Sequence, residues 1–286
     1  MHERFAPLSL ASAASFDAVI SAALREDVGL GDITTAATVQ GHALAYADIV
    51  MRCGGVLAGL PIAARAFALV DARIELELTA ADGSSVDQTT AVARVQGPAA
   101  GILTAERVAL NFLGQLSGIA TLTRAYVRAL AGLPTRIVDT RKTTPGLRSL
   151  ERYAVRAGGG ANHRFDLHEA VLIKDNHIAC VGSLGEALRR TRARNGPDVI
   201  VEVECDSLDQ VAEALREGVD ALLLDNMPLD VMRQAVALAR GRALTEASGG
   251  VGLPTVRDIA LTGVDVISVG ALTHSAPALD VGLDFR

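Results

Sequence analysis

The chain has 286 residues, with 27 lysines and arginines against 33 aspartates and glutamates and a formal net charge of −6. This acidic balance argues against nonspecific nucleic-acid binding, which needs a basic surface. We also expect no membrane segment, because no stretch reaches the roughly 18 uninterrupted apolar residues of a span and the first residues lack a signal-peptide pattern. The three cysteines have no metal-binding spacing and cannot all pair, which favours a reducing compartment and predicts a cytoplasmic protein.

The N-terminal part, residues 1–115, predicts an α+β domain of sandwich-like form. Apolar residues recur at helical spacing over 16–24, and a second helix is expected near 61–70. Polar and apolar side chains alternate over 73–78, as in a strand with one wet face. The segments that favour strands are 45–51, 73–78 and 91–95.

A long helical stretch follows over 103–131, and Ser117-Gly118 predicts a break in its middle. Beyond it, short apolar runs alternate with helical segments, which indicates parallel strands joined by crossover helices. The runs are 136–139, 171–174, 199–204, 221–225, 243–246 and 264–270. Six units predict an incomplete α/β barrel over 116–275, with an open doubly wound sheet as the alternative. The tail, 276–286, is expected to pack back on the N-terminal domain, and the fold class is α/β.

Nearly every apolar run of the second domain ends in a functional side chain. These side chains are Asp139, Lys174, Glu204, Asp225, Glu246 and Ser268. A single charge at a strand end can simply mark where a buried strand reaches water, but six consecutive strands make that interpretation weak. In parallel barrels the carboxyl ends of the strands form the active-site face, and different strands donate different groups. The pattern therefore favours the barrel.

The segment 136–174 holds eight lysines or arginines against four acidic residues, the reverse of the whole-chain balance. The cationic and histidine side chains on its expected strand ends and loops are Arg141, Lys142, His163, Arg164 and Lys174. Arginine forks match carboxylates and phosphates, and lysine supplies a point charge to the same groups. The cluster predicts a small, highly anionic ligand.

Carboxylates mark the next two strands. Glu202 and Glu204 are two residues apart and point to one face, and Asp225 ends the following strand. Carboxylates beside a cation cluster are either its counter-ions, or they hold Mg²⁺ or sugar hydroxyls. We expect Glu204 and Asp225 to be functional, whereas the core-facing Glu202 is expected to be structural.

Two glycine-containing turns follow the last two strands, Ser248-Gly249-Gly250 and Val269-Gly270-Ala271. Barrels frequently bind phosphate in the loops after their final strands, through backbone N–H groups and a helix N-terminus. The position of these turns, more than the glycines themselves, predicts a phosphate site.

These segments together resemble quinolinate phosphoribosyltransferase. The resemblance covers most of the chain from about residue 100 onward and is thinner before it, where residues 27–35 match best. The matching stretches are 104–107, 111–113, 116–121, 139–146, 158–164, 172–177, 202–207, 223–226, 246–250 and 268–274.

The resemblance implies an α/β N-terminal domain, an incomplete barrel and a homodimer whose site is shared between subunits. It also implies a reaction in which quinolinate and phosphoribosyl pyrophosphate give nicotinate mononucleotide, pyrophosphate and CO₂, with Mg²⁺ as cofactor. This reaction belongs to the biosynthesis of NAD.

By the same resemblance, each matching residue has an implied role. Arg107 would reach into the partner's site. The quinolinate carboxylates would be bound by Arg141, His163, Arg164 and Lys174. Ribose, pyrophosphate and Mg²⁺ would be faced by Lys142, Glu204 and Asp225, with Thr140 in the same substrate-binding motif. The 5′-phosphate would be held by Ser248, Gly249, Gly250, Val269, Gly270 and Ala271, with His274 on the phosphate side.

Three rival functions remain open from the sequence. A related phosphoribosyltransferase could act on nicotinate or another pyridine, although the four side chains assigned to quinolinate suit a diacid. A Schiff-base lyase would use Lys174 at its strand end. A noncatalytic carrier of a pyridine or an anion would have no need of the acidic pair.

Only two of the 27 basic residues are lysines, Lys142 and Lys174. A coding bias toward arginine explains the scarcity, and a lysine that survives it marks a position where a compact ammonium is needed. Both lysines lie in motifs of the expected ligand site. We therefore predict that replacing either by arginine impairs activity and leaves the fold intact.

Overall fold

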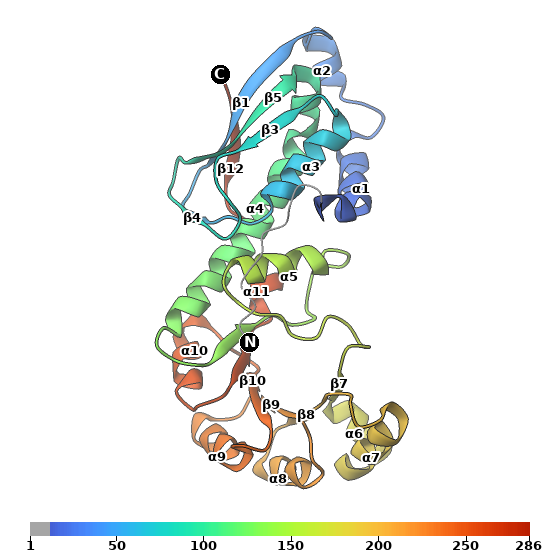
Figure 1. Ribbon diagram of the computed structural model, residues 1–286, viewed down its shortest axis with the longest axis vertical. Coiled ribbons are helices and arrows are strands. Elements are labelled where there is room, and N and C mark those ends of the chain that lie inside the picture. Colours follow the sequence, from blue (N-terminus) through green and yellow to red (C-terminus); the bar gives the residue numbers. More distant parts are fainter. Residues whose placement is uncertain (1–11) are drawn as a thin grey trace. The chain divides into compact units, whose positions relative to one another are not determined.

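The computed structural model describes residues 12–286, which form two compact units (Figure 1). The first unit contains residues 12–124, 143–159 and 272–286, and the second contains 125–142 and 160–271. Both units mix helices and strands, so the predicted α/β class, with a smaller N-terminal domain before a parallel-stranded one, is confirmed. The domain limits expected from the sequence stay a prediction.

The first unit is built on an antiparallel sheet of four strands in the order β12-β1-β5-β3, with a separate two-stranded pair, β2-β4. Its strands are β1 (Leu44–Met51), β2 (Gly55–Val56), β3 (Glu75–Leu78), β4 (Ser85–Val86), β5 (Ala91–Pro98) and β12 (Val281–Phe285). Its helices are the 3₁₀ helix η1 (Ser12–Phe16), α1 (Asp17–Val28), α2 (Ile33–Thr38), α3 (Leu60–Val70), α4 (Ala99–Ala129), whose last residues belong to the second unit, and α5 (Arg148–Ala157). The helices and strands predicted between residues 16 and 95 are confirmed.

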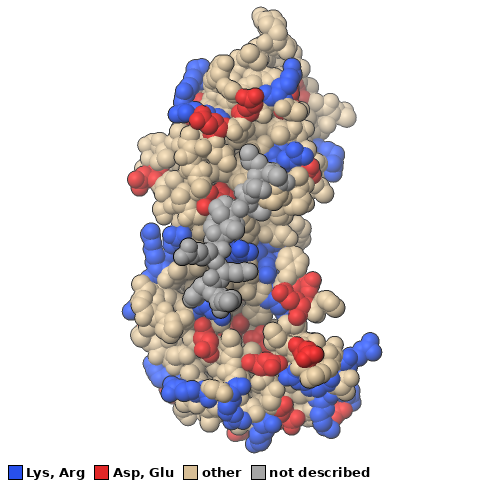
Figure 2. All heavy atoms as spheres, viewed as in Figure 1, with Lys and Arg blue, Asp and Glu red and all other residues tan. Residues whose placement is uncertain are grey.

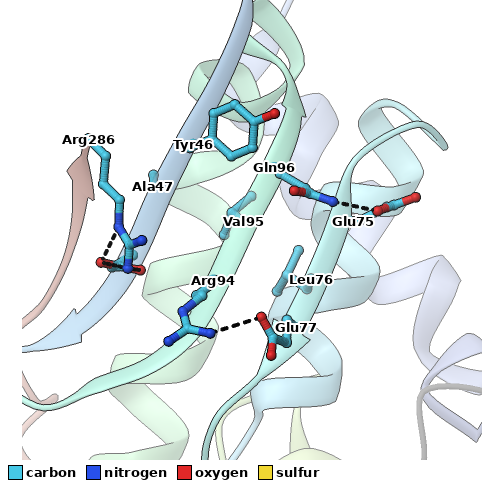
Figure 3. Close-up of a pocket in the computed structure, with 10 residues that line it drawn as sticks. Tyr46, Ala47, Glu75, Leu76, Glu77, Arg94, Val95, Gln96 and Arg286 are labelled. Atoms are coloured by element: carbon cyan, nitrogen blue, oxygen red, sulfur yellow. Dashed lines mark hydrogen bonds and ion pairs between the residues drawn. The ribbon is translucent and has the colours of Figure 1, made fainter.

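The four-stranded sheet has one apolar and one polar face, because side chains alternate along each strand. Ile49 and Val95 are buried on the apolar face, at 0% and 1% exposure, on the side where α3 and α4 lie (Figure 1). Figure 3 shows the polar face, where charged and amide side chains pair across neighbouring strands. The pairs are Gln96 with Glu75 (2.7 Å), Arg94 with Glu77 (3.1 Å) and Arg286 with Asp48 (2.7 Å).

Helix α4 runs unbroken for 31 residues, so the break predicted near Ser117-Gly118 is wrong. Glycine is needed there for close packing: a Cβ at Gly118 would lie 2.0 Å from the carbonyl oxygen of Pro277, and one at Gly114 would lie 2.7 Å from that of Leu279. A helical glycine costs about 1 kcal/mol relative to alanine without ending the helix. Within residues 12–286, no helix combines the length and apolar character needed to cross a membrane.

The second unit is built on six parallel strands in the order β6-β11-β10-β9-β8-β7. These strands are β6 (Arg136–Val138), β7 (Val171–Ile173), β8 (Val201–Cys205), β9 (Ala221–Asp225), β10 (Leu244–Ser248) and β11 (Val266–Ser268). Its helices are α6 (Asp175–Val181), α7 (Leu184–Asn195), α8 (Leu208–Arg216), α9 (Leu229–Ala239) and α10 (Leu253–Ala260). The short helix α11 (Ala271–His274) begins in this unit and continues in the first.

The strand order decides between the two sheet types that the sequence allowed. Successive strands from β7 to β11 are neighbours, and β6 follows on the far side of β11. A doubly wound sheet reverses its winding at a switch point, and this order does not, so the incomplete barrel is confirmed. Helices α7–α10 lie outside the strands (Figure 1). Over these helices, basic and acidic side chains are interspersed on the face shown in Figure 2.

Candidate active site

The parallel register places several predicted residues on one face of the six-stranded sheet. Residues that pair across neighbouring strands point to the same side. Glu204 pairs with Leu223 on β9, and Asp225, two residues further along β9, pairs with Ser248. Deeper on this face a cavity is lined by Val138, Glu202, Ala221, Leu244, Glu246 and Val266. This cavity lies at the amino ends of the strands, since Ala221, Leu244 and Val266 are the first residues of β9, β10 and β11. Glu204 and Asp225 lie on the same face toward the carboxyl ends.

Lys174 and Glu204 form an ion pair at the ends of β7 and β8. Lys174 follows the last residue of β7, and its Nζ contacts the Glu204 carboxylate directly. The Glu204 side chain is 16% exposed and that of Lys174 is 45% exposed. The pair lies at the rim of the sheet, where both groups can meet a ligand.

Arg141 and Arg164 lie on loops of the second unit and repel each other. Burial lowers the pKa of the Arg164 guanidinium and the positive charge of Arg141 lowers it further, while Glu202 and Asp166 oppose the shift. One Arg164 donor, Nη1, is used by the carbonyl oxygen of Ala170 at 2.7 Å. Two like charges that influence each other favour the binding of an anion.

The loop after β6 is tied to the segment that carries His163. The buried carboxylate of Asp139, at 0% exposure, accepts hydrogen bonds from the His163 backbone N–H (2.9 Å) and from Nδ2 of Asn162 (2.5 Å). The next residues form a turn in which the Lys142 N–H donates to Oγ1 of Thr140 (3.1 Å). Asp139 therefore fixes two predicted ligand-binding segments against each other. The sequence indicated Asp139 because this residue follows a buried strand. It did not indicate which groups donate hydrogen bonds to the carboxylate.

His163 is held between two buried carboxylates. Its Nε2 lies 3.3 Å from Glu202 and 3.2 Å from Glu246, with side-chain exposures of 13%, 8% and 5% in that order. This is the one group of three metal-ligating side chains within residues 12–286. However, Nε2 donates its proton to these carboxylates, and the Arg164 backbone N–H lies 2.7 Å from Nδ1. These contacts make a hydrogen-bond network of the cluster, and a protonated Nε2 has no lone pair for a metal.

The same cluster holds an additional proton at neutral pH. Burial lowers the pKa of His163, but the hydrogen bonds and charges of Glu202 and Glu246 outweigh it and raise that pKa to about 10. Burial also raises the pKa of Glu202, and the charge of Glu246 adds to the rise. With that pKa, the additional proton lies on the His163 ring, which the two carboxylates stabilise. Glu202, expected to be structural, thus acts together with Glu246.

Asn226 links the end of β9 to the turn after β10. Its backbone lies in the left-handed region, with φ of +51°, and its N–H donates to the carbonyl oxygen of Ser248 at 2.9 Å. Its Nδ2 donates to Asp225 at 2.8 Å. The sequence analysis missed this residue, although it ends one of the matching stretches, because its contacts to residue 248 depend on the fold. The turn 248–250 leads to the N-terminus of α10, as a phosphate site requires.

The second predicted phosphate turn follows β11. The Val269 N–H donates to the carbonyl oxygen of Val138 at 3.0 Å, which joins this turn to β6, and Gly270-Ala271 leads into α11. The two remaining predicted residues belong to the first unit. Arg107 lies on α4 with its side chain 61% exposed, and His274 ends α11 with Nδ1 2.7 Å from Oγ of Ser275.

Comparisons with known proteins agree with this architecture. Family models of quinolinate phosphoribosyl transferase match the chain, the N-terminal domain over residues 32–117 and the C-terminal domain over 119–284. A probable nicotinate-nucleotide pyrophosphorylase (carboxylating) of Bacillus subtilis is 45% identical over 259 residues, which cover 91% of this chain and 89% of that protein. The nicotinate-nucleotide pyrophosphorylase (carboxylating) of Mycobacterium leprae is 45% identical over 280 residues, which cover 94% and 98%.

A solved structure extends the likeness to the whole fold. The crystal structure of NadC from Streptococcus pyogenes has a TM-score of 0.93 to this chain at 43% identity and covers 98% of this chain and 99% of that one. Both family models, the two relatives and this structure agree over nearly the full length. The chain therefore belongs to the quinolinate phosphoribosyltransferase family.

Proposed function

We propose that the chain transfers a phosphoribosyl group from phosphoribosyl pyrophosphate to quinolinate with loss of CO₂, giving nicotinate mononucleotide and pyrophosphate for NAD biosynthesis. The observation that carries this proposal is the match of both quinolinate phosphoribosyl transferase family models over nearly the full chain, and the influence of the Arg141 charge on Arg164 supports it. Lys174 adds a third cation at the rim of the same sheet. A planar diacid such as quinolinate supplies the two negative charges that this arrangement favours.

In the first step the pyridine nitrogen attacks C1 of the ribose, and the bond from C1 to the pyrophosphate oxygen breaks. The chain need supply no nucleophile of its own. C1 gains positive charge as pyrophosphate leaves, and the carboxylates of Glu204 and Asp225 stabilise this charge, while Lys142 faces the leaving pyrophosphate. Holding both substrates in line accounts for roughly 7–11 kcal/mol of the barrier in well-oriented reactions.

In the second step the ribosylated ring nitrogen is cationic and accepts electrons. The bond between the ring and its adjacent carboxylate breaks, CO₂ leaves, and the electron pair that stays on the ring carbon takes up a proton. The carboxylates of quinolinate are bound by Arg141, Arg164 and Lys174, and the family resemblance adds His163 to this set. Thr140 contributes through the turn that shapes the Lys142 backbone.

The 5′-phosphate is proposed to lie at the two glycine turns, 248–250 and 269–271, and the family resemblance adds His274 to the phosphate-binding residues. Support comes from the anchoring of the first turn by Asn226 and from the start of α10 directly beyond it. Backbone N–H groups at such a helix start bind phosphate oxygens.

Glu204 and Asp225 are proposed to hold Mg²⁺, directly or through substrate and water. Their carboxylates lie on one sheet face, on adjacent strands. Mg²⁺ sites commonly consist of one or two carboxylates plus substrate phosphates, so this donor set fits the ion. Bound there, Mg²⁺ would neutralise charge on the leaving pyrophosphate.

A homodimer is also proposed, in which Arg107 enters the partner's site. Support comes from two large apolar side chains that are almost wholly exposed, Leu30 at 112% and Ile33 at 84%. Between them, Asp32 accepts a hydrogen bond from Oγ1 of Thr104 at 3.2 Å. Thr104 lies one helical turn before Arg107 on α4, so the apolar pair and Arg107 are parts of one surface of the first unit. The expected cytoplasmic location stays a prediction, which cell fractionation tests.

The decisive experiment follows CO₂ and pyrophosphate release from quinolinate and phosphoribosyl pyrophosphate, with nicotinate as the competing substrate. Arg141→Ala and Arg164→Ala should each raise KM for quinolinate about 10- to 100-fold, because charged hydrogen bonds are worth about 1.5–3 kcal/mol. Arg233→Ala, at an exposed position on α9, is the matched control. Near-normal KM in both site variants would overturn the assignment, and faster turnover of nicotinate would overturn the substrate.

The Schiff-base alternative is tested in the same preparation. The Nζ of Lys174 is engaged by the carboxylate of Glu204, a contact that a Schiff-base nucleophile would have to give up. Borohydride should therefore trap no substrate on Lys174.

A further inference from the structure

Arg164 and Ala170 lie at the two ends of a loop to which the family resemblance assigns no role. The Nη1 of Arg164 donates to the carbonyl oxygen of Ala170 at 2.7 Å, across the exposed residues 165–169. This loop lies between the matching stretches 158–164 and 172–177. Because Arg164 is one of the residues to which quinolinate is assigned, a group that fixes this loop also fixes a donor of the proposed site.

Acidic side chains close the loop from within. The backbone N–H of Phe165 donates to the carboxylate of Glu169, so the first and last residues of the loop are joined to each other. Inside this contact, the N–H groups of His168 (2.8 Å) and Glu169 (3.1 Å) donate to Oδ1 of Asp166, and these hydrogen bonds lower the pKa of Asp166. The contact that joins the two ends of the loop therefore depends on one side chain, that of Glu169.

The chain on either side of the loop is fixed to the parallel sheet. Before the loop, the Ala161 N–H donates to the carbonyl oxygen of Ile137 on β6 at 2.8 Å. After it, the Val171 N–H donates to the carbonyl oxygen of Ile200 at 3.0 Å. The loop thus connects β6 and β7, the two edges of the six-stranded sheet. With both flanks fixed, the closure of the loop determines where the Ala170 carbonyl group holds the guanidinium of Arg164.

We infer that Glu169 is a positioning residue, which keeps the loop 165–169 closed and thereby aims the Arg164 guanidinium at a quinolinate carboxylate. This inference rests on the proposed function and deepens it, because it adds a residue that acts through Arg164 without touching the substrate. Burial and the like charge of Arg141 both disfavour the charged form of Arg164. A guanidinium released from Ala170 would therefore turn away from Arg141 and toward water.

Substitution of Glu169 separates its hydrogen bond from its charge. Glu169→Gln removes the charge but keeps Oε1 as an acceptor for the Phe165 N–H, whereas Glu169→Ala removes both. KM for quinolinate should rise about fivefold or more in Glu169→Ala and less than about twofold in Glu169→Gln, because a lost hydrogen bond and a small misplacement both weaken binding. Glu169 is exposed, so both variants should fold.

The controls distinguish positioning from a general structural effect. Glu217→Ala, at an exposed position after α8, is the matched control for the loss of an acidic side chain and should leave both KM values unchanged. KM for phosphoribosyl pyrophosphate should stay within about twofold in both Glu169 variants. An unchanged KM for quinolinate in Glu169→Ala, equal rises in the two Glu169 variants, or an equal rise for the two substrates would overturn the inference.

Hydrogen exchange of the apo protein separates this inference from the proposed function. The amides of residues 164–170, followed by mass spectrometry, should exchange faster in Glu169→Ala than in the wild type, and at wild-type rates in Glu169→Gln. Equal exchange in all three proteins would show that Glu169 does not close the loop and would overturn the inference. If the wild type releases no CO₂ from quinolinate, the proposed function fails instead, and the exchange rates still show whether Glu169 closes the loop.

Discussion

Gly249 lies so close to Asn226 that a Cβ at position 249 would come within 2.2 Å of Oδ1 of Asn226. Gly249 also has φ of +90°, in the region that favours glycine. The backbone N–H of Asn226 in turn donates a hydrogen bond to the carbonyl oxygen of Ser248. The two residues therefore shape the turn to which we assign the 5′-phosphate, and neither can be exchanged independently.

Gly249→Ala should raise KM for phosphoribosyl pyrophosphate about tenfold or more, because both the clash and the backbone strain displace the N–H groups of the turn. KM for quinolinate should change far less. Gly185→Ala, on α7, is the matched control, since the nearest atom to its Cβ would be Oε1 of Glu217 at 3.5 Å. Steady-state kinetics of the two variants checks this, and equal effects would contradict the assignment of the turn.

The six strands and the residues at their ends could be predicted from the sequence. A buried strand appears as a short apolar run, and a charged residue such as Lys174, Glu204 or Asp225 marks where the run ends. The sequence could not explain the glycine at position 118 within an unbroken helix. The explanation is the close approach of the Pro277 carbonyl group, and Pro277 lies more than 150 residues away in the chain. Asn226 was missed for the same reason. Contacts between distant segments decide such positions, and a single sequence does not display them.

Lys142→Arg and Lys174→Arg should each lower kcat/KM by about tenfold or more while leaving the thermal unfolding curve unchanged. The Nζ of Lys174 contacts Glu204 directly, and a planar guanidinium is larger and distributes its donors differently. Arg189→Lys, on an exposed turn of α7, tests whether arginine–lysine exchange is harmless elsewhere. Wild-type rates in both site variants would leave coding bias as the whole explanation for the two lysines.

Leu30→Glu and Ile33→Glu should weaken the proposed dimer. Each introduces a charge at an apolar side chain that is almost fully exposed in the single chain, and burying an unpaired charge in an interface is strongly unfavourable. Sedimentation velocity over a dilution series measures the shift toward monomer, and activity should fall with it if Arg107 acts across the interface. Leu261→Glu, on an exposed site of the second unit (53%), is the control, and an unchanged dimer in both test variants would contradict the proposed surface.

The cysteines should differ sharply in reactivity. Burial raises the pKa of the Cys205 thiol to about 12, and the carboxylates of Asp206 and Glu204 add to the rise. Because the thiolate is the reactive form, iodoacetamide at pH 8 should leave Cys205 unmodified in the folded protein and modify the exposed Cys180. Peptide mass spectrometry before and after unfolding in urea checks this, and labelling of Cys205 in the native state would contradict its burial.

Asp82 should make the stability of the first unit depend on pH in an unusual direction. Burial raises the pKa of this carboxyl above its ordinary value of 3.8, although hydrogen bonds from Tyr153, Gly59 and Leu60 partly offset the rise. Between the two pKa values the folded chain binds more protons than the unfolded chain, so the contribution of Asp82 to the free energy of unfolding falls as pH rises through this window.

Urea unfolding of the wild type and of Asp82→Asn at a series of pH values tests this directly, because the variant does not titrate at this position. The free energy of unfolding of the wild type minus that of Asp82→Asn should be largest below the ordinary pKa and should decline toward neutral pH. Tyr153→Phe removes the 2.6 Å donor to Asp82, which raises the pKa of Asp82 further and should widen the window of decline. A difference that grows as the pH rises would show that the hydrogen bonds to the carboxylate outweigh its burial.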